Sequence, residues 1–253
     1  MQRSAVRPSP VFFGILALTV VGGVLAAFGQ PSNDDPMTVG GIFLLVIGGW
    51  ALSLTLHEFG HAFVAFKGGD YEVASKGYLN MDVRRYTDPV LSLVLPLLFL
   101  AIGGIPLPGG AVWINRWALR NRAFASWTSL AGPLTNLLFG IVLAVAVQLI
   151  PMPLTLLIGL SFLALLQIAT FVLNILPVPG LDGYGAIEPY LSPEAREFGA
   201  KARPWAPLVL FALLFAVPAV GATFWDAVYW LYEVCGGDSY SARVGGGTFQ
   251  FWR

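Results

Sequence analysis

Two histidines and a glutamate near the end of one long apolar stretch are the residues of this chain best suited to do chemistry. The stretch, residues 38–66, is apolar for nearly its whole length except at His57, Glu58 and His61. Histidines four residues apart share one face of a helix, so both imidazoles can bind one metal ion. Glu58 follows the first histidine, where its carboxylate can reach a water at the metal. The pattern therefore predicts a metal site with a carboxylate beside it.

The three residues spell H-E-x-x-H, which on a helix is the signature of zinc metalloproteases. The same pattern arises by chance in soluble, polar helices. Here it lies in a stretch long enough, at about 1.5 Å per residue, to cross a bilayer of about 30 Å. An unpaired glutamate in such a segment would cost several kcal/mol, so ionisable groups there indicate function. His57 and His61 are also the only histidines in the chain.

The composition is that of a polytopic membrane protein. Hydrophobic residues make up 57% of the chain and charged residues 11%, whereas roughly a quarter of the residues in soluble domains are charged. Lys and Arg balance Asp and Glu, and no basic face indicates a nucleic-acid partner. The single cysteine, Cys235, excludes an intrachain disulfide and a cysteine-based zinc cluster.

Five apolar runs predict membrane spans. The first run, residues 11–29, is also compatible with a signal peptide, because small residues lie near its end. We expect a retained span, since the run is longer than a usual signal core. We expect Pro218 to kink the last run, and Ser192 and Pro193 to start a short surface helix that ends near Lys201. The runs are residues 11–29, 38–66, 124–150, 154–176 and 204–232.

The segment between the second and third spans, residues 67–122, combines two patterns. Residues 68–83 mix β-forming residues with glycine, which predicts short extended strands. The next part, from residue 89, begins hydrophobic enough to enter the membrane. Its second half, residues 103–114, is too rich in glycine and proline to continue a helix and reads as an extended or hairpin segment.

These patterns predict the fold class. We expect an all-α polytopic membrane protein with about five to six transmembrane helices and a re-entrant, partly β-hairpin segment at residues 67–122. Residues 1–253 would form a single integral membrane domain with its core at 38–183. The tail at 236–253 is rich in glycine and serine, and we expect it to be flexible.

The third metal ligand must come from elsewhere in the chain. A catalytic zinc usually takes three protein ligands and keeps one position for water. Because no histidine remains, the third ligand is expected to be a carboxylate, and Asp182 is the best candidate. It lies just beyond the fourth span, where prolines break the helix and glycines let the backbone turn inward. Irregular backbone at membrane depth must be buried in protein or line a cavity. The alternative is an exit loop with a solvated aspartate.

Topology supports this pairing. For His61 and Asp182 to meet, an even number of crossings must separate them, and the third and fourth spans supply two. Residues 91–102 must then enter the membrane and return. With that arrangement, Arg243 and Arg253 fall on one side of the membrane. The other, more basic side is then the cytosolic side, and the active site lies toward it. That side holds Arg3, Arg7, Lys67, Lys76, Arg84, Arg85, Arg116, Arg120, Arg122, Arg196, Lys201 and Arg203.

Three motifs in this order resemble the site-2 protease family of intramembrane zinc metalloproteases. They are His57-Glu58-Phe59-Gly60-His61, Gly132-Pro133-Leu134-Thr135-Asn136, and the N-x-x-P-x-P-x-L-D-G run from Asn174 to Gly183. The resemblance implies a core of three helices that binds zinc through two histidines and an aspartate. It also implies regulated proteolysis of membrane-anchored substrates. Many members carry a PDZ or CBS domain, for which this chain has no room. Substrate selection would therefore rest on the membrane elements or on a separate adaptor protein.

The mechanism expected from this resemblance is hydrolysis with Glu58 as general base. The substrate would be a single-span helix that unwinds locally in the bilayer. Asn174 and the backbone at Pro177 and Pro179 are the candidates for pairing with the unwound strand. Asn136 is a further candidate for substrate binding, although a role in helix packing is an equal alternative.

Other functions remain open on the sequence. The main alternative is a non-proteolytic zinc-binding membrane scaffold or chaperone, which would not need Glu58. A metal transporter would need polar residues on several spans, and the first and fifth show almost none. A prenyl-protein protease also uses H-E-x-x-H, but its third ligand is usually Glu. Iron and cobalt are also compatible with two histidines and one aspartate.

Overall fold

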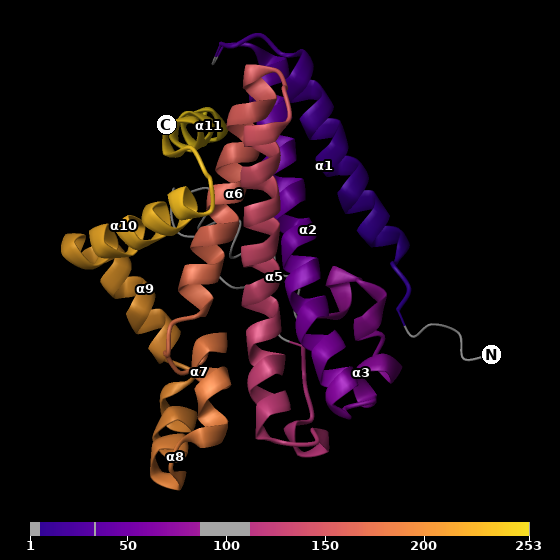
Figure 1. The fold of residues 1–253 in the computed structure, drawn as a ribbon, viewed down its shortest axis with the longest axis vertical. Helices are drawn as coiled ribbons and strands as arrows, with labels where there is room; N and C mark the ends of the chain where they lie inside the picture. Colours follow the sequence, from indigo (N-terminus) through magenta and orange to yellow (C-terminus); the bar gives the residue numbers. More distant parts are fainter. Residues whose placement is uncertain (1–5, 33, 87–111, 253) are drawn as a thin grey trace.

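Helix α2, Pro36–Gly68, is the central element of the protein and carries the H-E-x-x-H motif. The computed structural model describes residues 6–32, 34–86 and 112–252. In that part of the chain, α1 (Pro10–Phe28), α2, α5 (Arg122–Leu149) and α6 (Leu154–Asn174) are long and apolar enough to cross a membrane. A bent pair of shorter helices raises the number of candidate spans from four to five. The four long helices follow the long axis of the molecule (Figure 1), so the protein is multi-pass.

Local sequence explains where α2 begins and ends. Asp35 caps its first turn by accepting a hydrogen bond from the Thr38 backbone N–H at 3.0 Å, and Pro36 occupies the first turn, where no donor is needed. At the other end Gly69 adopts φ 120°, a conformation that favours glycine. The predicted bounds of this helix, 38–66, are therefore correct to within two residues at each end.

Small residues bring α1 and α2 into close contact. A Cβ on Gly41 would collide with the backbone of Ala26, and one on Gly22 would collide with the backbone of Leu45. Close backbone approach through small residues is how helices gain packing energy in lipid, where burial of apolar surface gives none. The first predicted span is thus packed along α2.

The segment after α2 is helical where we expected strands. Residues 68–83 include α3 (Glu72–Ser75) and the 3₁₀ turn η1 (Tyr78–Asn80), and η2 (Val83–Arg85) follows. Aspartate side chains explain the difference: Asp70 accepts from the Glu72 N–H at 3.1 Å, and Asp82 accepts from the Arg84 N–H at 3.2 Å. Such local bonds favour tight turns over extended strands.

The chain leaves α2 and enters α5 at the same place. The Arg120 N–H donates to the Gly68 carbonyl at 2.9 Å, so α2 ends and α5 begins at the same end of the bundle. The re-entrant segment expected at 91–102, and most of the hairpin expected at 103–114, lie outside the described residues.

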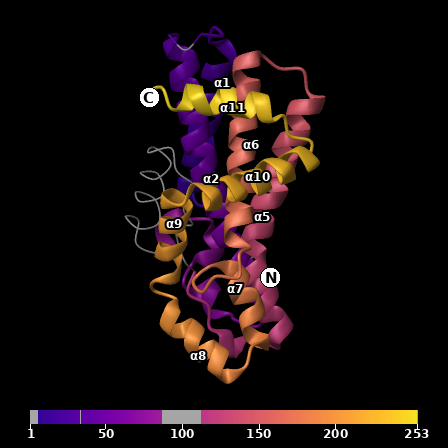
Figure 2. The ribbon, with the colours of Figure 1, turned by 90° about the vertical axis from the view of Figure 1, so that its left-hand side faces the viewer.

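Beyond α6 the chain forms shorter helices. These are α7 (Asp182–Ile187), η5 (Glu188–Tyr190), α8 (Pro193–Ala202), α9 (Ala206–Ala216), α10 (Pro218–Val234) and α11 (Ser239–Phe249). Ser192 caps α8, as predicted. The fifth predicted span, residues 204–232, is not one kinked helix, because it is divided into α9 and α10, between which the chain changes direction sharply (Figure 1). The bent pair that could cross the membrane is instead α8 with α9. Helices α10 and α11 cross the bundle instead of following it (Figure 2).

The prediction of a flexible tail at 236–253 is wrong for α11. Asp238 caps this helix by accepting from the backbone N–H groups of Tyr240 and Ser241. Ala242 and Phe249 are buried, and the Phe249 ring lies 5.5 Å from that of Phe162 on α6. The glycines that suggested mobility allow close packing instead, because a Cβ on Gly245 would collide with the backbone of Ile158.

Candidate metal centre

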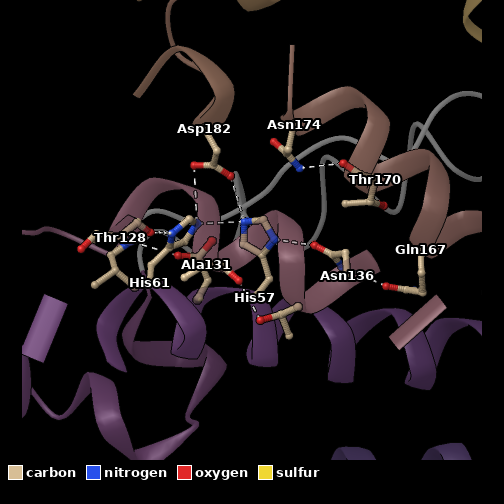
Figure 3. Close-up of polar contacts among 12 residues, drawn as sticks. His57, His61, Thr128, Ala131, Asn136, Gln167, Thr170, Asn174 and Asp182 are labelled. Carbon is tan, nitrogen blue, oxygen red and sulfur yellow. Dashed lines mark hydrogen bonds and ion pairs between the residues drawn. The ribbon is translucent and has the colours of Figure 1, made fainter. Parts of the chain in front are cut away.

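The side chains of His57, His61 and Asp182 converge although α2 and α7 are far apart in sequence (Figure 3). The Nε2 atoms of the two imidazoles are 3.1 Å apart. Asp182 Oδ2 lies 3.2 Å from His57 Nε2, and Asp182 Oδ1 lies 3.5 Å from His61 Nε2. Both histidines are buried and Asp182 is half-buried. The sequence prediction that these three residues meet is therefore borne out in space.

The spacing fits a zinc ion. With zinc–ligand bonds of about 2.0–2.2 Å, the ligand atoms of a tetrahedral shell are about 3.3–3.6 Å apart. The distances between the three side chains, 3.1, 3.2 and 3.5 Å, lie within that range or just below it. A set of two imidazoles and one carboxylate is also a ligand set typical of catalytic zinc.

Gly132 on α5 provides the space in front of the imidazoles. A Cβ at this position would lie 2.6 Å from His57 Nε2 and closer still to His61 Nε2. Any side chain here would fill the volume into which both nitrogens point. Gly132 is therefore a close-contact position between α5 and the two imidazoles.

Helix α5 also fixes the orientation of both imidazoles. His57 Nδ1 lies 2.5 Å from Asn136 Oδ1, and His61 Nδ1 lies 2.6 Å from the Thr128 carbonyl. Both partners are acceptors, so each Nδ1 must be protonated and donate. Each Nε2 then presents a lone pair toward Asp182, which is the tautomer that a metal-binding histidine needs.

A tight turn after α6 aims Asp182 at the histidines. The Leu181 N–H donates to the Val178 carbonyl at 2.9 Å, with Pro179 and Gly180 between them. Gly180 has φ 102°, as the third residue of a type II turn requires. Asp182 then begins α7.

An ion-pair cluster holds α7 in place. Glu188, the first residue of η5 directly after α7, pairs with Arg116 before α5 and with Arg203 after α8. The side chain of Glu188 is largely shielded, whereas those of both arginines are about half exposed. A carboxylate shared by two guanidinium groups ties three segments together near the metal centre.

Glu58 faces a cavity next to the ligands. Its side chain is buried, and one carboxylate oxygen accepts a hydrogen bond from the Val112 N–H at 3.0 Å. The cavity has a volume of about 680 Å³. Its lining includes the three candidate ligands and Glu58, together with Asn174, Gly180, Leu181, Tyr184, Arg116 and Trp117. A peptide segment in this cavity would lie against both Glu58 and the metal.

The four candidate substrate-binding residues are placed differently. Asn174 lines the cavity and donates to the Thr170 carbonyl at 3.1 Å. Asn136 is buried behind His57, which it contacts through its side-chain oxygen. Pro177 and Pro179 belong to the chain between α6 and α7 that precedes Asp182. Their roles toward substrate stay predictions.

Sequence reasoning missed three groups at the centre. They are the Thr128 carbonyl, the Val112 N–H and the Gln167 side chain, which accepts from Asn136 at 2.9 Å. The first two are backbone groups and leave no trace in residue type. Gln167 carried a signal, since a glutamine in an otherwise apolar span is costly unless it is paired.

Comparisons with known proteins agree with this geometry. A protein of Mycobacterium tuberculosis named "Putative zinc metalloprotease Rip2" is 47% identical over 253 residues, which cover 99% of this chain and 96% of that protein. Its counterpart in Mycolicibacterium smegmatis is 43% identical over 252 residues, with the same coverage. A protein of Bacillus subtilis named "Putative zinc metalloprotease YwhC" is 29% identical over 185 residues, which cover 69% of this chain and 81% of that protein. No protein-family model and no solved structure matches the chain.

Proposed function

Because this chain belongs to the site-2 protease family of zinc metalloproteases, we propose that it hydrolyses peptide bonds in or near the transmembrane segments of membrane-anchored proteins. The observation that carries the proposal is the meeting of His57, His61 and Asp182 beside Glu58, at a cavity within a bundle of candidate membrane spans. A peptidase needs a metal position, a base and space for a peptide, and these lie together here.

Each side chain has a distinct task in the proposed reaction. Zinc, when bound by the two histidines and Asp182, supplies a Lewis acid that acidifies water and polarises the scissile carbonyl. Glu58 takes a proton from that water and passes it to the leaving amine. The Val112 N–H orients the Glu58 carboxylate. Asn136 and the Thr128 carbonyl hold the imidazoles so that both Nε2 atoms face inward.

The location of the centre favours a transmembrane substrate. His57 and His61 lie within the long apolar helix α2, about two to three turns from its end at Gly68. A single-span substrate helix must unwind before its peptide bonds can be attacked at that depth, because the hydrogen bonds within the helix shield them. Asn174, at the end of α6, is the side chain in the cavity best placed to pair with an unwound strand. A separate adaptor protein would present the substrate, and the centre would lie toward the cytosolic side.

The Glu58→Gln variant tests the general base. We expect purified, zinc-loaded protein in proteoliposomes to lose about 10²–10⁴-fold in the rate of cleaving a panel of single-span reporter helices, because an amide cannot accept the proton. Its zinc content should stay that of wild type. Glu197→Gln, at an exposed position of α8, is the matched control. Cleavage by Glu58→Gln at the wild-type rate would remove Glu58 from the mechanism.

Replacing the third ligand separates metal binding from catalysis. Asp182→Ala should lose both zinc and cleavage, whereas Glu58→Gln should lose only cleavage. Asp226→Ala, an exposed aspartate on α10, controls for removal of a carboxylate from a helix of the same protein. Full zinc occupancy in Asp182→Ala would contradict the proposed ligand set.

A further inference from the structure

A chain of buried side-chain hydrogen bonds runs from the metal centre through three helices. His57 on α2 contacts Asn136 on α5, and Asn136 contacts Gln167 on α6 (Figure 3). The two links measure 2.5 and 2.9 Å. Gln167 lines no part of the cavity described above, so it touches neither the metal position nor a bound peptide. Within the described residues, its side-chain hydrogen bond toward the centre is the one to Asn136.

The direction of these bonds is fixed from the histidine outward. A metal at Nε2 requires a proton on Nδ1, so Nδ1 donates and Asn136 must present its oxygen. The amide of Asn136 then presents its Nδ2 donor to the far side, where Gln167 Oε1 accepts. If Gln167 offered its amino group instead, two donors would face each other and Asn136 would be driven to turn over. The orientation of one amide therefore decides that of the next.

The burial of Gln167 indicates that this arrangement is maintained at a cost. The residue has no exposed surface, and its Nε2 atom has no hydrogen-bond partner within the described part of the chain. Leaving a buried amide donor unpaired costs about 1–3 kcal/mol. A leucine or methionine here would avoid that cost in an apolar helix. The glutamine keeps the one atom that Asn136 needs, its acceptor oxygen.

We propose that Gln167 is a positioning residue for the metal centre: it fixes the amide orientation of Asn136, and thereby the tautomer and the orientation of the His57 imidazole. The inference rests on the proposed function, because it assumes that His57 binds zinc. Hydrogen bonds behind a metal-binding histidine tune metal affinity by about 10–100-fold. Gln167 acts one step further away, so the lower end of that range applies.

The test measures zinc affinity and not only activity. The full chain is purified in detergent, stripped of metal, and titrated with zinc against a chromophoric chelator. We expect Gln167→Met, which keeps the length of the side chain but removes the acceptor, to weaken zinc binding by about tenfold. Gln167→Glu keeps an acceptor toward Asn136 and should retain the wild-type affinity. The absorption spectrum of the cobalt-loaded protein should change in Gln167→Met and remain unchanged in Gln167→Glu.

Two comparisons separate positioning from general damage to α6. Ser161→Ala removes another buried polar side-chain atom from the same helix and should leave zinc affinity unchanged. In a double-mutant cycle, Asn136→Ala combined with Gln167→Met should bind zinc no more weakly than Asn136→Ala alone, because the second residue acts only through the first. Losses that add in full would show that Gln167 acts by another route and would overturn the proposal.

The outcomes distinguish this inference from the proposed function. If wild type binds zinc and Gln167→Met binds it equally well with an unchanged cobalt spectrum, the positioning role is wrong and the metal site stands. If wild type itself binds no zinc, the proposed function fails first, and the positioning role fails with it. Equal losses in Gln167→Met and Gln167→Glu would also reject the role, because only one of them lacks the acceptor.

Discussion

Gly132 sets how closely α5 approaches the two imidazoles. Its Cα faces both Nε2 atoms, and an added methyl group would occupy the volume that the metal needs. We expect Gly132→Ala to bind no zinc under conditions that saturate wild type, and to be destabilised by about 1–3 kcal/mol from overpacking. Metal analysis of the purified protein and its thermal unfolding measure the two effects.

Gly14 provides the matched control for this substitution. It lies in α1, and a Cβ there would meet nothing within 4 Å. Gly14→Ala should therefore keep full zinc occupancy and stability. Zinc retained by Gly132→Ala would mean that α5 can move away from the imidazoles, and the close fit argued above would be wrong.

The three candidate ligands could be predicted from the sequence because two follow from helix spacing and the third from the lack of a further histidine. His57 and His61 are placed by helix periodicity alone, and Asp182 followed once no histidine remained for the third position. The groups that orient the ligands could not be predicted in the same way. Whether Asn136 faces α2, α6 or the cavity depends on the rotation of α5 about its axis, which tertiary packing decides. The contact with His57 became visible only with the fold.

At the scale of elements, the turn between α6 and α7 controls the third ligand. Gly180 has φ 102°, and a Cβ there would also press on Pro207. Gly180→Ala should cost about 1–3 kcal/mol of backbone strain and displace the start of α7. Because Asp182 is the first residue of that helix, we expect zinc affinity to fall while His57 and His61 keep their places.

The adjacent position offers a control for this turn. Pro179→Ala keeps a residue that can adopt the conformation of the second turn position, so it should reduce zinc affinity less than Gly180→Ala. Chelator competition on both purified variants gives the comparison. A larger loss in Pro179→Ala than in Gly180→Ala would mean that the rigidity of proline, and not the left-handed glycine, positions Asp182.

Elements were predictable where an apolar run sets their length or a recognisable cap begins them, as Ser192 begins α8, and were not where aspartate side chains bond to the backbone of short turns. The bounds of α1, α5 and α6 match the apolar runs to within about two residues. The strands expected at 68–83 failed because Asp70 and Asp82 bond to nearby backbone N–H groups, an effect that β propensity does not register. In α11, Gly245 was read as a sign of mobility when it is a packing contact with α6.

On the scale of the whole molecule, the metal centre and most of the basic residues lie toward one end. Helices α2 and α6 both finish there, and α3, α7 and α8 gather around them (Figure 1). Arg116 and Arg203 flank the cavity at this end, while Arg243 lies in α11, which crosses the bundle elsewhere. Exposed tryptophans Trp117 and Trp205 are also close to the arginine pair in sequence, as expected for residues at a membrane interface.

This asymmetry predicts the orientation of the protein in the membrane. Loops rich in Lys and Arg remain on the cytosolic side, so α8 should face the cytosol and the turn between α1 and α2 should face away from it. In a Cys235→Ser background, single cysteines are introduced by Ser32→Cys in that turn and by Glu197→Cys in α8. Both positions are exposed, so both should react with a maleimide once the membrane is dissolved.

Sealed right-side-out vesicles then discriminate between the two sides. A maleimide that cannot cross the bilayer should label the Ser32→Cys variant and leave the Glu197→Cys variant unlabelled until detergent is added. Because α2 and α6 deliver His61 and Asp182 to the end where α8 lies, the same result places the proposed hydrolytic centre in the cytosolic half of the membrane. The reverse pattern would place it in the opposite half, and its substrates would then be cut from the other side.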